Sequence, residues 1–390
     1  MAINSGFTDG AYGELITKDK MSANYPYLIP ASIAGGTRVW AWGQGNTGQL
    51  GLGDATSKSS PVQVGSLLTW QNIACGYKHT VATKTDGSLW TWGRNILGQL
   101  GLGDIIDRSS PIQVGSLLTW NNVAVGYRHT AATKTDGSLW AWGENQWGQL
   151  GLGDIAHRSS PVQVGSLLTW NKVSGGQYHI IATKTDGSLW TWGYNGSGQL
   201  GLGNTTHRSS PVQVGSLLTW NNAAGGAYHT LATKTDGSLW GCGYNGFGQL
   251  GLDDRTDRNS PVQVGSLMTW NKVACGQYHT LATKTDGSLW TCGYNNNGQL
   301  GLGDIAHRSS PTQVGSLLTW NNVSGGYRQF AATQTNGSLW GCGYNGWGQT
   351  GLSDTIYRSS PVQVGSLLTW DKVAAGWFHT VATTTTPTTW

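Results

Sequence analysis

Histidine is the residue type that most readily suggests chemistry in this chain, because it can transfer protons or bind metal ions near neutral pH. Six histidines recur on a grid of 50 residues, and Gln329 takes the same place in the remaining unit: His79, His129, His179, His229, His279 and His379. A residue that repeats in every unit cannot mark one catalytic centre. The other three, His157, His207 and His307, occur singly, without the spacing of a metal site. We therefore predict neither catalytic nor metal-ligating residues.

Carboxylates and cysteines give no stronger indication of an enzyme. A glycoside hydrolase needs a pair of carboxylates that is particular to one place in the fold. Glu144 and Asp253 are the acids that depart from the repeat, and they lie two units apart. The five cysteines form no CxxC pair, and those at 242, 292 and 342 share one unit position, which indicates small buried side chains. We predict a non-enzymatic protein without a cofactor.

Composition excludes several other classes of protein. Of 390 residues, 60 are glycine, 22 are tryptophan and only 11% are charged. Such a sequence is unsuited to a helical bundle, its glycines do not follow the period of collagen, and no apolar run could span a membrane. The net charge of +4 is spread along the chain and predicts no nucleic-acid partner. Residues 1–20 lack the features of a secretory signal.

The elements that position these side chains come from a repeat of 50 residues without insertions. In the unit 70–114, the segments 72–75, 79–83, 88–92 and 111–114 are predicted to be strands A, B, C and D, and Thr85-Asp86-Gly87 is predicted to be the tight B–C turn. A propeller has four to eight blades of four strands. We therefore predict an all-β fold, a seven-bladed β-propeller of four-stranded antiparallel blades over 37–390, preceded by a leader, 1–36.

The unit boundaries also predict how the ring closes and what fills it. Strands C and D come first, at 37–42 and 61–64, and strands A and B come last, near 373 and 379–383, so one blade must pair the two ends of the chain. The strand-C tryptophans, such as Trp90 and Trp140, are predicted to fill the space between blades. Lys84 with Asp86, and Asp104 with Arg108, are interpreted as solvated loop charges.

Three short patterns carry a family resemblance. Gly-Gln-Leu-Gly at 48–51 and in the five following units, Trp-Gly or Cys-Gly just before it, and Gly-x-x-His-Thr at 76–80 and 126–130 resemble the regulator of chromosome condensation repeat. The resemblance extends over residues 40–389 and implies a propeller in which the histidine satisfies backbone groups at the start of strand B. Family members include a nucleotide-exchange factor for a small GTPase, a plant UV-B photoreceptor and a bacterial β-lactamase inhibitor.

Two of these family activities are disfavoured here. The exchange factor carries an inserted wedge, whereas the repeats of this chain have no insertion. The photoreceptor carries tryptophan after the glycine of Gly-x-x-His-Thr in neighbouring blades, and here only Trp377 occupies that position. The third activity, binding of a protein through an aromatic face in the manner of the β-lactamase inhibitor, is kept as an alternative.

Differences between the copies indicate a binding face. Residues 44–47, 55–57 and 77–78 vary from unit to unit, and all of them belong to A–B or C–D loops, which emerge on the same face of an antiparallel blade. Tyr, Trp and Arg are the residues that interface hot spots prefer. Neutral drift of exposed loops is the alternative. The predicted partner-binding residues are Tyr77, Lys78, Tyr127, Arg128, Trp147, Tyr178, Tyr228, Phe247, Tyr278, Tyr327, Arg328, Trp347, Trp377 and Phe378.

A weaker resemblance suggests where such a protein works. A short leader before near-identical repeats resembles virion structural proteins of environmental tailed phages. We therefore predict a tail, fibre or capsid-associated virion component that binds other virion subunits or a host surface molecule. The alternative is a cytoplasmic inhibitor or regulatory scaffold for a GTPase or an enzyme. The apolar residues of the leader 1–36 predict an assembly arm that docks on another subunit, with folding back onto its own propeller as the alternative.

Overall fold

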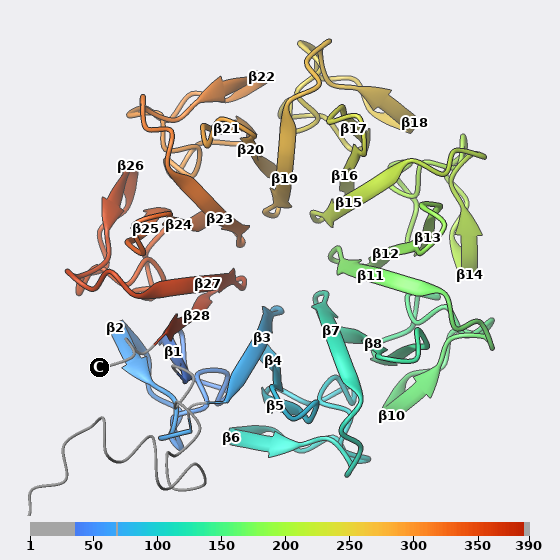
Figure 1. Ribbon diagram of the computed structural model, residues 1–390, viewed down its shortest axis with the longest axis vertical. Coiled ribbons are helices and arrows are strands. Elements are labelled where there is room, and N and C mark those ends of the chain that lie inside the picture. The colour runs from blue at the N-terminus through green and yellow to red at the C-terminus, as the bar shows by residue number, and fades with distance from the viewer. Residues whose placement is uncertain (1–35, 68, 386–390) are drawn as a thin grey trace, which may run out of the picture.

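The computed structural model describes residues 36–67 and 69–385, and every regular element in them is a β-strand. Twenty-eight strands form seven sheets of four, arranged as blades around a central axis (Figure 1). The predicted seven-bladed propeller is confirmed. Seen along the axis, strand A of each blade lies nearest the centre and strand D lies at the periphery (Figure 1).

The strand bounds repeat almost without change. Strand A is β3 (Trp70–Cys75), β7 (Trp120–Val125), β11 (Trp170–Gly175), β15 (Trp220–Gly225), β19 (Trp270–Cys275), β23 (Trp320–Gly325) and β27 (Trp370–Ala375). Strand B is β4 (His79–Lys84), β8 (His129–Lys134), β12 (His179–Lys184), β16 (His229–Lys234), β20 (His279–Lys284), β24 (Gln329–Gln334) and β28 (His379–Thr385).

The two outer strands repeat in the same way. Strand C is β5 (Leu89–Gly93), β9 (Leu139–Gly143), β13 (Leu189–Gly193), β17 (Leu239–Gly243), β21 (Leu289–Gly293), β25 (Leu339–Gly343) and, at the start of the chain, β1 (Thr37–Gly43). Strand D is β6 (Arg108–Gln113), β10 (Arg158–Gln163), β14 (Arg208–Gln213), β18 (Arg258–Gln263), β22 (Arg308–Gln313), β26 (Arg358–Gln363) and β2 (Lys58–Gln63).

Strand D begins earlier than the sequence predicted. In the first complete blade it begins at Arg108 rather than at Pro111, so the proline lies inside the strand. The register passes from Thr91↔Ile112 to Gly93↔Arg108 with an irregularity between them. Proline is tolerated here because strand D is an edge strand and this stretch is out of the regular ladder, where a missing N–H costs little.

The ring closes by the predicted mixing of the two ends of the chain. The closing sheet has the order β2-β1-β28-β27. Strands β1 and β28 are antiparallel, with Val39 opposite Thr383 and Trp42 opposite Thr380. Three antiparallel strand pairings thereby join the first and last units of the chain into one blade. This closure is what gives every blade two neighbours.

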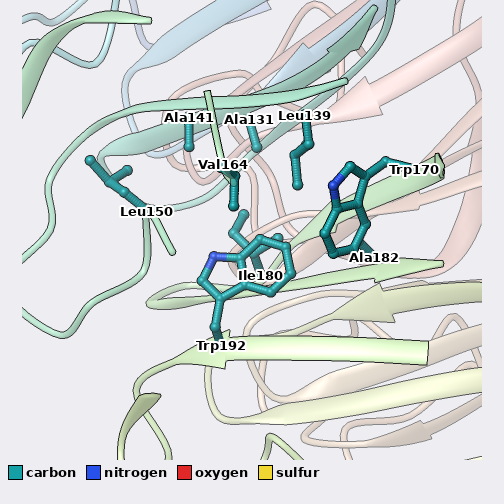
Figure 2. Close-up of a cluster of buried hydrophobic side chains, with 9 residues drawn as sticks. All are labelled: Ala131, Leu139, Ala141, Leu150, Val164, Trp170, Ile180, Ala182 and Trp192. Carbon is teal, nitrogen blue, oxygen red and sulfur yellow. The ribbon is translucent and has the colours of Figure 1, made fainter. Parts of the chain in front are cut away.

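The hydrophobic core lies between blades, as the tryptophan pattern predicted. Figure 2 shows one such layer, in which Leu139 and Leu150 of one blade face Trp170, Ile180 and Trp192 of the next. The two tryptophans of a strand C differ in depth. Trp92 and its counterparts Trp42, Trp142 and Trp192 are fully buried, whereas the series that includes Trp90 and Trp140 is half-buried.

The lysine that ends strand B lies over the half-buried tryptophan of strand C in five of the seven blades. The Nζ of Lys84 lies 3.5 Å from the centroid of the Trp90 ring, and the Lys84 residue is only 5% exposed. Burial lowers the pKa of Lys84. The interpretation of Lys84 as a solvated charge is therefore wrong. Asp86 accepts hydrogen bonds from the backbone N–H and hydroxyl of Ser88, and the Trp90 indole N–H donates to that same hydroxyl.

Candidate functional site

The repeated histidines are parts of the interface between blades. The Nε2 of His179 lies 2.9 Å from the Oγ1 of Thr230 in the next blade. Because the Thr230 hydroxyl donates to the carbonyl of Gln199, the imidazole N–H donates to the hydroxyl oxygen. His179 therefore binds a side chain of the next blade, whereas His79 and His129 also interact with the backbone at the start of strand B of the next blade, in line with what the family resemblance implied. Burial lowers the pKa of His179 to about 3, so the ring is neutral at physiological pH.

Residues 36–67 and 69–385 contain no cluster of three His, Cys, Asp or Glu side chains that could hold a metal ion. Cys242, Cys292 and Cys342 are buried free thiols, as predicted, and burial raises the pKa of the Cys242 thiol to about 12. No helix in the described chain is long and apolar enough to cross a membrane.

All fourteen predicted binding residues lie in A–B or C–D loops, and backbone hydrogen bonds join these two loops side by side. The N–H of Arg94, in a C–D loop, donates to the carbonyl of Lys78, in the A–B loop of the same blade, at 2.8 Å. Tyr194 and Tyr178 repeat this bond two blades further on. Trp347 is 42% exposed, and the other thirteen residues are half-buried. We call this side of the propeller the loop face.

The aromatic side chains of the loop face contact one another around the axis. An unbroken series of ring contacts, with centroids 4.2 to 6.4 Å apart, runs through Tyr327, Trp377, Tyr77, Tyr127, Tyr178, Tyr228 and Tyr278. Phe378 contacts Tyr77, and Phe247 contacts Tyr278. Trp147 and Trp347 are not part of this series. Trp147 packs on Tyr194 and His207, and Trp347 makes no ring contact within the described residues.

A second set of tyrosines completes the face, and the predicted set missed it. Tyr194, Tyr244 and Tyr294 occupy the first position after strand C; Tyr194 and Tyr244 contact tyrosines of the A–B loops, and the guanidinium of Arg328 lies over the Tyr294 ring. For example, the rings of Tyr194 and Tyr228 are 5.8 Å apart. The signal was present in the sequence, because this unit position reads Gln, Arg and Glu in three copies and Tyr in the other four.

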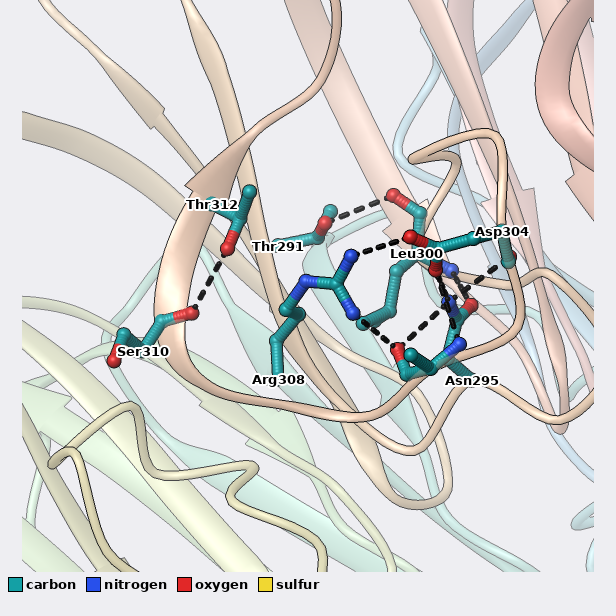
Figure 3. Close-up of polar contacts among 8 residues, drawn as sticks. Thr291, Asn295, Leu300, Asp304, Arg308, Ser310 and Thr312 are labelled. Atoms are coloured by element: carbon teal, nitrogen blue, oxygen red, sulfur yellow. Dashed lines mark hydrogen bonds and ion pairs between the residues drawn. The ribbon is translucent and has the colours of Figure 1, made fainter.

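The long C–D loops that carry part of this face are held by side-chain hydrogen bonds. Figure 3 shows one of them, in which the amide of Asn295 donates to the carbonyl of Asp304 and accepts from the N–H of Leu300. Arg308 pairs with Asp304, and the N–H of Ala306 is the main cause of the lowered pKa of Asp304. Equivalent bonds recur in other blades. The loop face is thus a preorganised surface, which reduces the entropy lost on binding.

Glycines form the mouth of the central channel on this face. A Cβ added to Gly126 would lie 2.6 Å from the carbonyl oxygen of Gly176 in the next blade, and the same close approach recurs at Gly276. Only glycine allows the blades to converge this closely. They surround a cavity of about 90 Å³, beside which Trp377 and the amides of Gln177 and Gln277 lie.

Three cationic side chains lie on the aromatic rings of this mouth. The guanidinium groups of Arg128 and Arg328 are each 4.8 Å from the ring centroids of Tyr127 and Tyr327, and Lys78 lies 5.4 Å from the ring centroid of Tyr77. Burial raises the pKa of Tyr127 to about 12, so its phenol stays neutral. Such an arrangement can bind a partner through apolar rings and charge-assisted hydrogen bonds.

Comparison with known proteins identifies relatives over most of the described chain. The family model of the RCC1-like domain matches residues 123–327, and that of the regulator of chromosome condensation (RCC1) repeat matches residues 38–83, 86–133 and 336–383. The ultraviolet-B receptor UVR8 of Arabidopsis thaliana is 41% identical over 58 residues, which are 14% of this chain and 13% of the receptor.

Solved structures of the same architecture extend over nearly the whole propeller. Prp20p from Saccharomyces cerevisiae superposes with a TM-score of 0.80 at 21% sequence identity, covering 90% of this chain and 92% of that structure. Human WBSCR16 superposes with a TM-score of 0.81 at 22% identity, covering 90% of this chain and 99% of that structure. At these identities the likeness establishes the fold.

Proposed function

This chain belongs to the family of RCC1-like domains built from regulator of chromosome condensation repeats, and from that premise we propose that it is a non-enzymatic binding module whose loop face holds a protein partner. The observation that carries the proposal is the continuous aromatic series from Tyr327 to Tyr278, with arginines stacked on it and stiff loops beneath it. Tyr, Trp and Arg dominate the energetics of protein interfaces.

Solved relatives of this fold support a protein as the partner. The structure of Prp20p was described together with its binding to Gsp1p and histones, and another structure has yeast RCC1 (Prp20) bound to Kap60. They favour the regulatory-scaffold alternative over a virion component. The virion hypothesis rests on the leader 1–36 and on the layout of the repeats, and the role of the leader as an assembly arm stays a prediction, because residues 1–35 lie outside the described residues.

The test separates binding from folding. Proteins that the full chain retains are identified, and the dissociation constant of a purified partner is measured by calorimetry for the native chain and for a Tyr127→Ala, Trp377→Ala variant. We expect binding to weaken by a factor of ten or more, about 1.4 kcal/mol or more, with the thermal unfolding midpoint nearly unchanged, because both side chains lie in half-buried loops.

A matched variant on the opposite face is the control. Leu117 and Leu118 lie in a D–A connection and are 51% and 55% exposed, so Leu117→Ala, Leu118→Ala removes exposed apolar side chains without touching the loop face. If this variant loses the partner while the loop-face variant keeps it, the proposed face is wrong.

A further inference from the structure

Six cations of the described chain form an ion pair with a carboxylate. Six ion pairs link the first residue of a strand D to the aspartate four residues before it, as in Arg158–Asp154. These pairs lie on the outer part of six of the seven blades, since Asn204 replaces the aspartate before Arg208. Lys78, Arg128 and Arg328, at the mouth of the channel, take part in no such pair within the described residues. The three cations at the mouth of the channel are therefore among those of the described chain that form no ion pair.

The two arginines also lack hydrogen-bond acceptors. The buried Nε atoms of Arg128 and Arg328 have no partner among residues 36–67 and 69–385. Lys78 contacts only the side-chain oxygen of Asn46, at 3.4 Å. Glu144 interacts electrostatically with Arg128 without forming an ion pair, and burial raises the pKa of Glu144. An unpaired buried donor is costly, so these guanidinium groups have unused binding capacity.

The position of each guanidinium group over its ring determines which N–H donors remain available to a ligand. The central guanidinium carbons of Arg128 and Arg328 lie over the Tyr127 and Tyr327 rings, each 4.8 Å from the ring centroid. A guanidinium that stacks on a ring still directs its N–H donors outward in its own plane, where they fit the two oxygens of a carboxylate. Aromatic stacking thus fixes the arginines in position without consuming their donors.

The cations are confined to one sector of the ring. The pair of residues after the A–B glycine reads Tyr327-Arg328, Trp377-Phe378, Tyr77-Lys78 and Tyr127-Arg128 on four consecutive blades, and Gln-Tyr, Ala-Tyr and Gln-Tyr on the other three. Trp377 lies between the two stacks, with its ring 4.8 Å from both Tyr127 and Tyr327. We call these four pairs the cationic arc.

We propose that the cationic arc binds an acidic segment of a protein partner, whose carboxylates accept hydrogen bonds from Arg128 and Arg328 while an apolar side chain packs on Trp377 at the mouth of the channel. This inference rests on the proposed function and specifies the chemistry of the partner. The complementary charges are carboxylates because planar, bidentate acceptors match a stacked guanidinium.

A single-stranded nucleic acid would also offer anions, but the rings of the arc are poorly placed to stack on bases. Base stacking needs open aromatic faces. Tyr77 and Tyr127 lie 4.2 Å apart, Tyr327 stacks on Trp377, and the guanidinium groups cover further ring area. The faces of these rings are largely occupied by one another, which favours a protein ligand.

The test uses the full chain and three labelled probes: a peptide of glutamates around a central leucine, the same peptide with glutamine in place of glutamate, and an oligothymidylate of the same charge. Fluorescence anisotropy should give a dissociation constant at least about tenfold lower for the acidic peptide than for either of the others. Arg128→Gln and Arg328→Gln should each weaken binding of the acidic peptide by about tenfold. Arg128→Lys should weaken it several-fold, because an ammonium lacks the forked donors.

Arg158→Gln is the matched control, since it removes the same charge from an outer strand whose arginine is already paired with Asp154. It should leave the affinity within about twofold of the native value. The inference is overturned if no binding of the acidic peptide is detected, if the glutamine peptide or the oligothymidylate binds as well, or if Arg158→Gln weakens binding as much as Arg128→Gln. The Tyr127→Ala, Trp377→Ala variant separates this inference from the proposed function. If one of these results is obtained and that variant still loses partner binding, the loop face is retained as the proposed binding surface and only the acidic ligand is rejected.

Discussion

At the scale of single residues, burial determines what the repeated polar side chains do. The six grid histidines are completely buried, and burial lowers the pKa to about 3 for His79, His129, His179, His229 and His379 and to about 4 for His279. In the unfolded chain the same rings titrate near pH 6.5. Between these values the unfolded state binds more protons than the folded state, so acid favours unfolding.

The expected consequence is a propeller that loses stability in mild acid. The free energy of unfolding should be nearly constant above pH 7 and fall below about pH 6.5, by at most about 1.4 kcal/mol per pH unit for each histidine. His129→Gln introduces the residue that the chain already has at the same unit position, Gln329. It should reduce the pH dependence of the free energy of unfolding by the contribution of one histidine. Urea unfolding of both proteins across this pH range measures the difference, and an unchanged slope in the variant would contradict the buried-neutral assignment.

At the scale of the strand pair, one blade fills its core with a different residue. In the first complete blade Thr80 on strand B lies opposite Trp92 on strand C, and in the sixth Phe330 lies opposite Cys342. A Cβ on Gly51 would meet the Trp92 ring at 2.8 Å, and a Cβ on the equivalent Gly301 would meet the Phe330 ring at 3.0 Å. Phenylalanine on strand B therefore occupies space that tryptophan on strand C fills elsewhere.

This exchange predicts compensation between two positions. Phe330→Thr alone should cost about 3 to 5 kcal/mol, because it leaves a cavity beside Cys342. Adding Cys342→Trp should recover most of that loss, since it recreates the Thr80–Trp92 pair. A double-mutant cycle by urea unfolding gives the coupling energy. If the changes in the free energy of unfolding caused by the two single substitutions add up to the change in the double variant, the side chains at 330 and 342 do not fill the same part of the core.

At the scale of the whole molecule, stability depends on the blade that joins the two ends of the chain. Strands β1 and β2 cannot form a stable sheet by themselves, because an isolated hairpin is marginal in water. They need β28 and β27, and the neighbouring blades in turn need this blade to cover their apolar faces. The ring is therefore expected to unfold as one cooperative unit.

Removing residues 371–390, which deletes β28 and nearly all of β27, should abolish the cooperative thermal transition. The matched control removes only residues 386–390 and leaves all four strands of the closing blade intact. Circular dichroism and calorimetry compare the two truncations with the full chain. A long truncation that melts like the full chain would disprove closure by strand pairing.

The sequence alone determined the architecture and the candidate face. A repeat of 50 residues with turn residues at fixed places fixes the number of blades, the strand order and the loops on each face, because strand patterning and turn chemistry are local properties. It therefore also predicted that Trp42 would lie on a strand paired with the end of the chain, and that Tyr127 and Trp377 would lie on one face.

Only the tertiary structure decided which side chains meet. Lys84 covers Trp90, His179 bonds Thr230 of another blade, and Phe330 takes the space of a tryptophan. Trp377, at one end of the chain, contacts Tyr77 near the other because the ring closes. A periodic pattern assigns each residue a place in its blade, but these contacts depend on how neighbouring blades converge toward the axis, and that geometry is set by packing between blades rather than by the local pattern within any one of them.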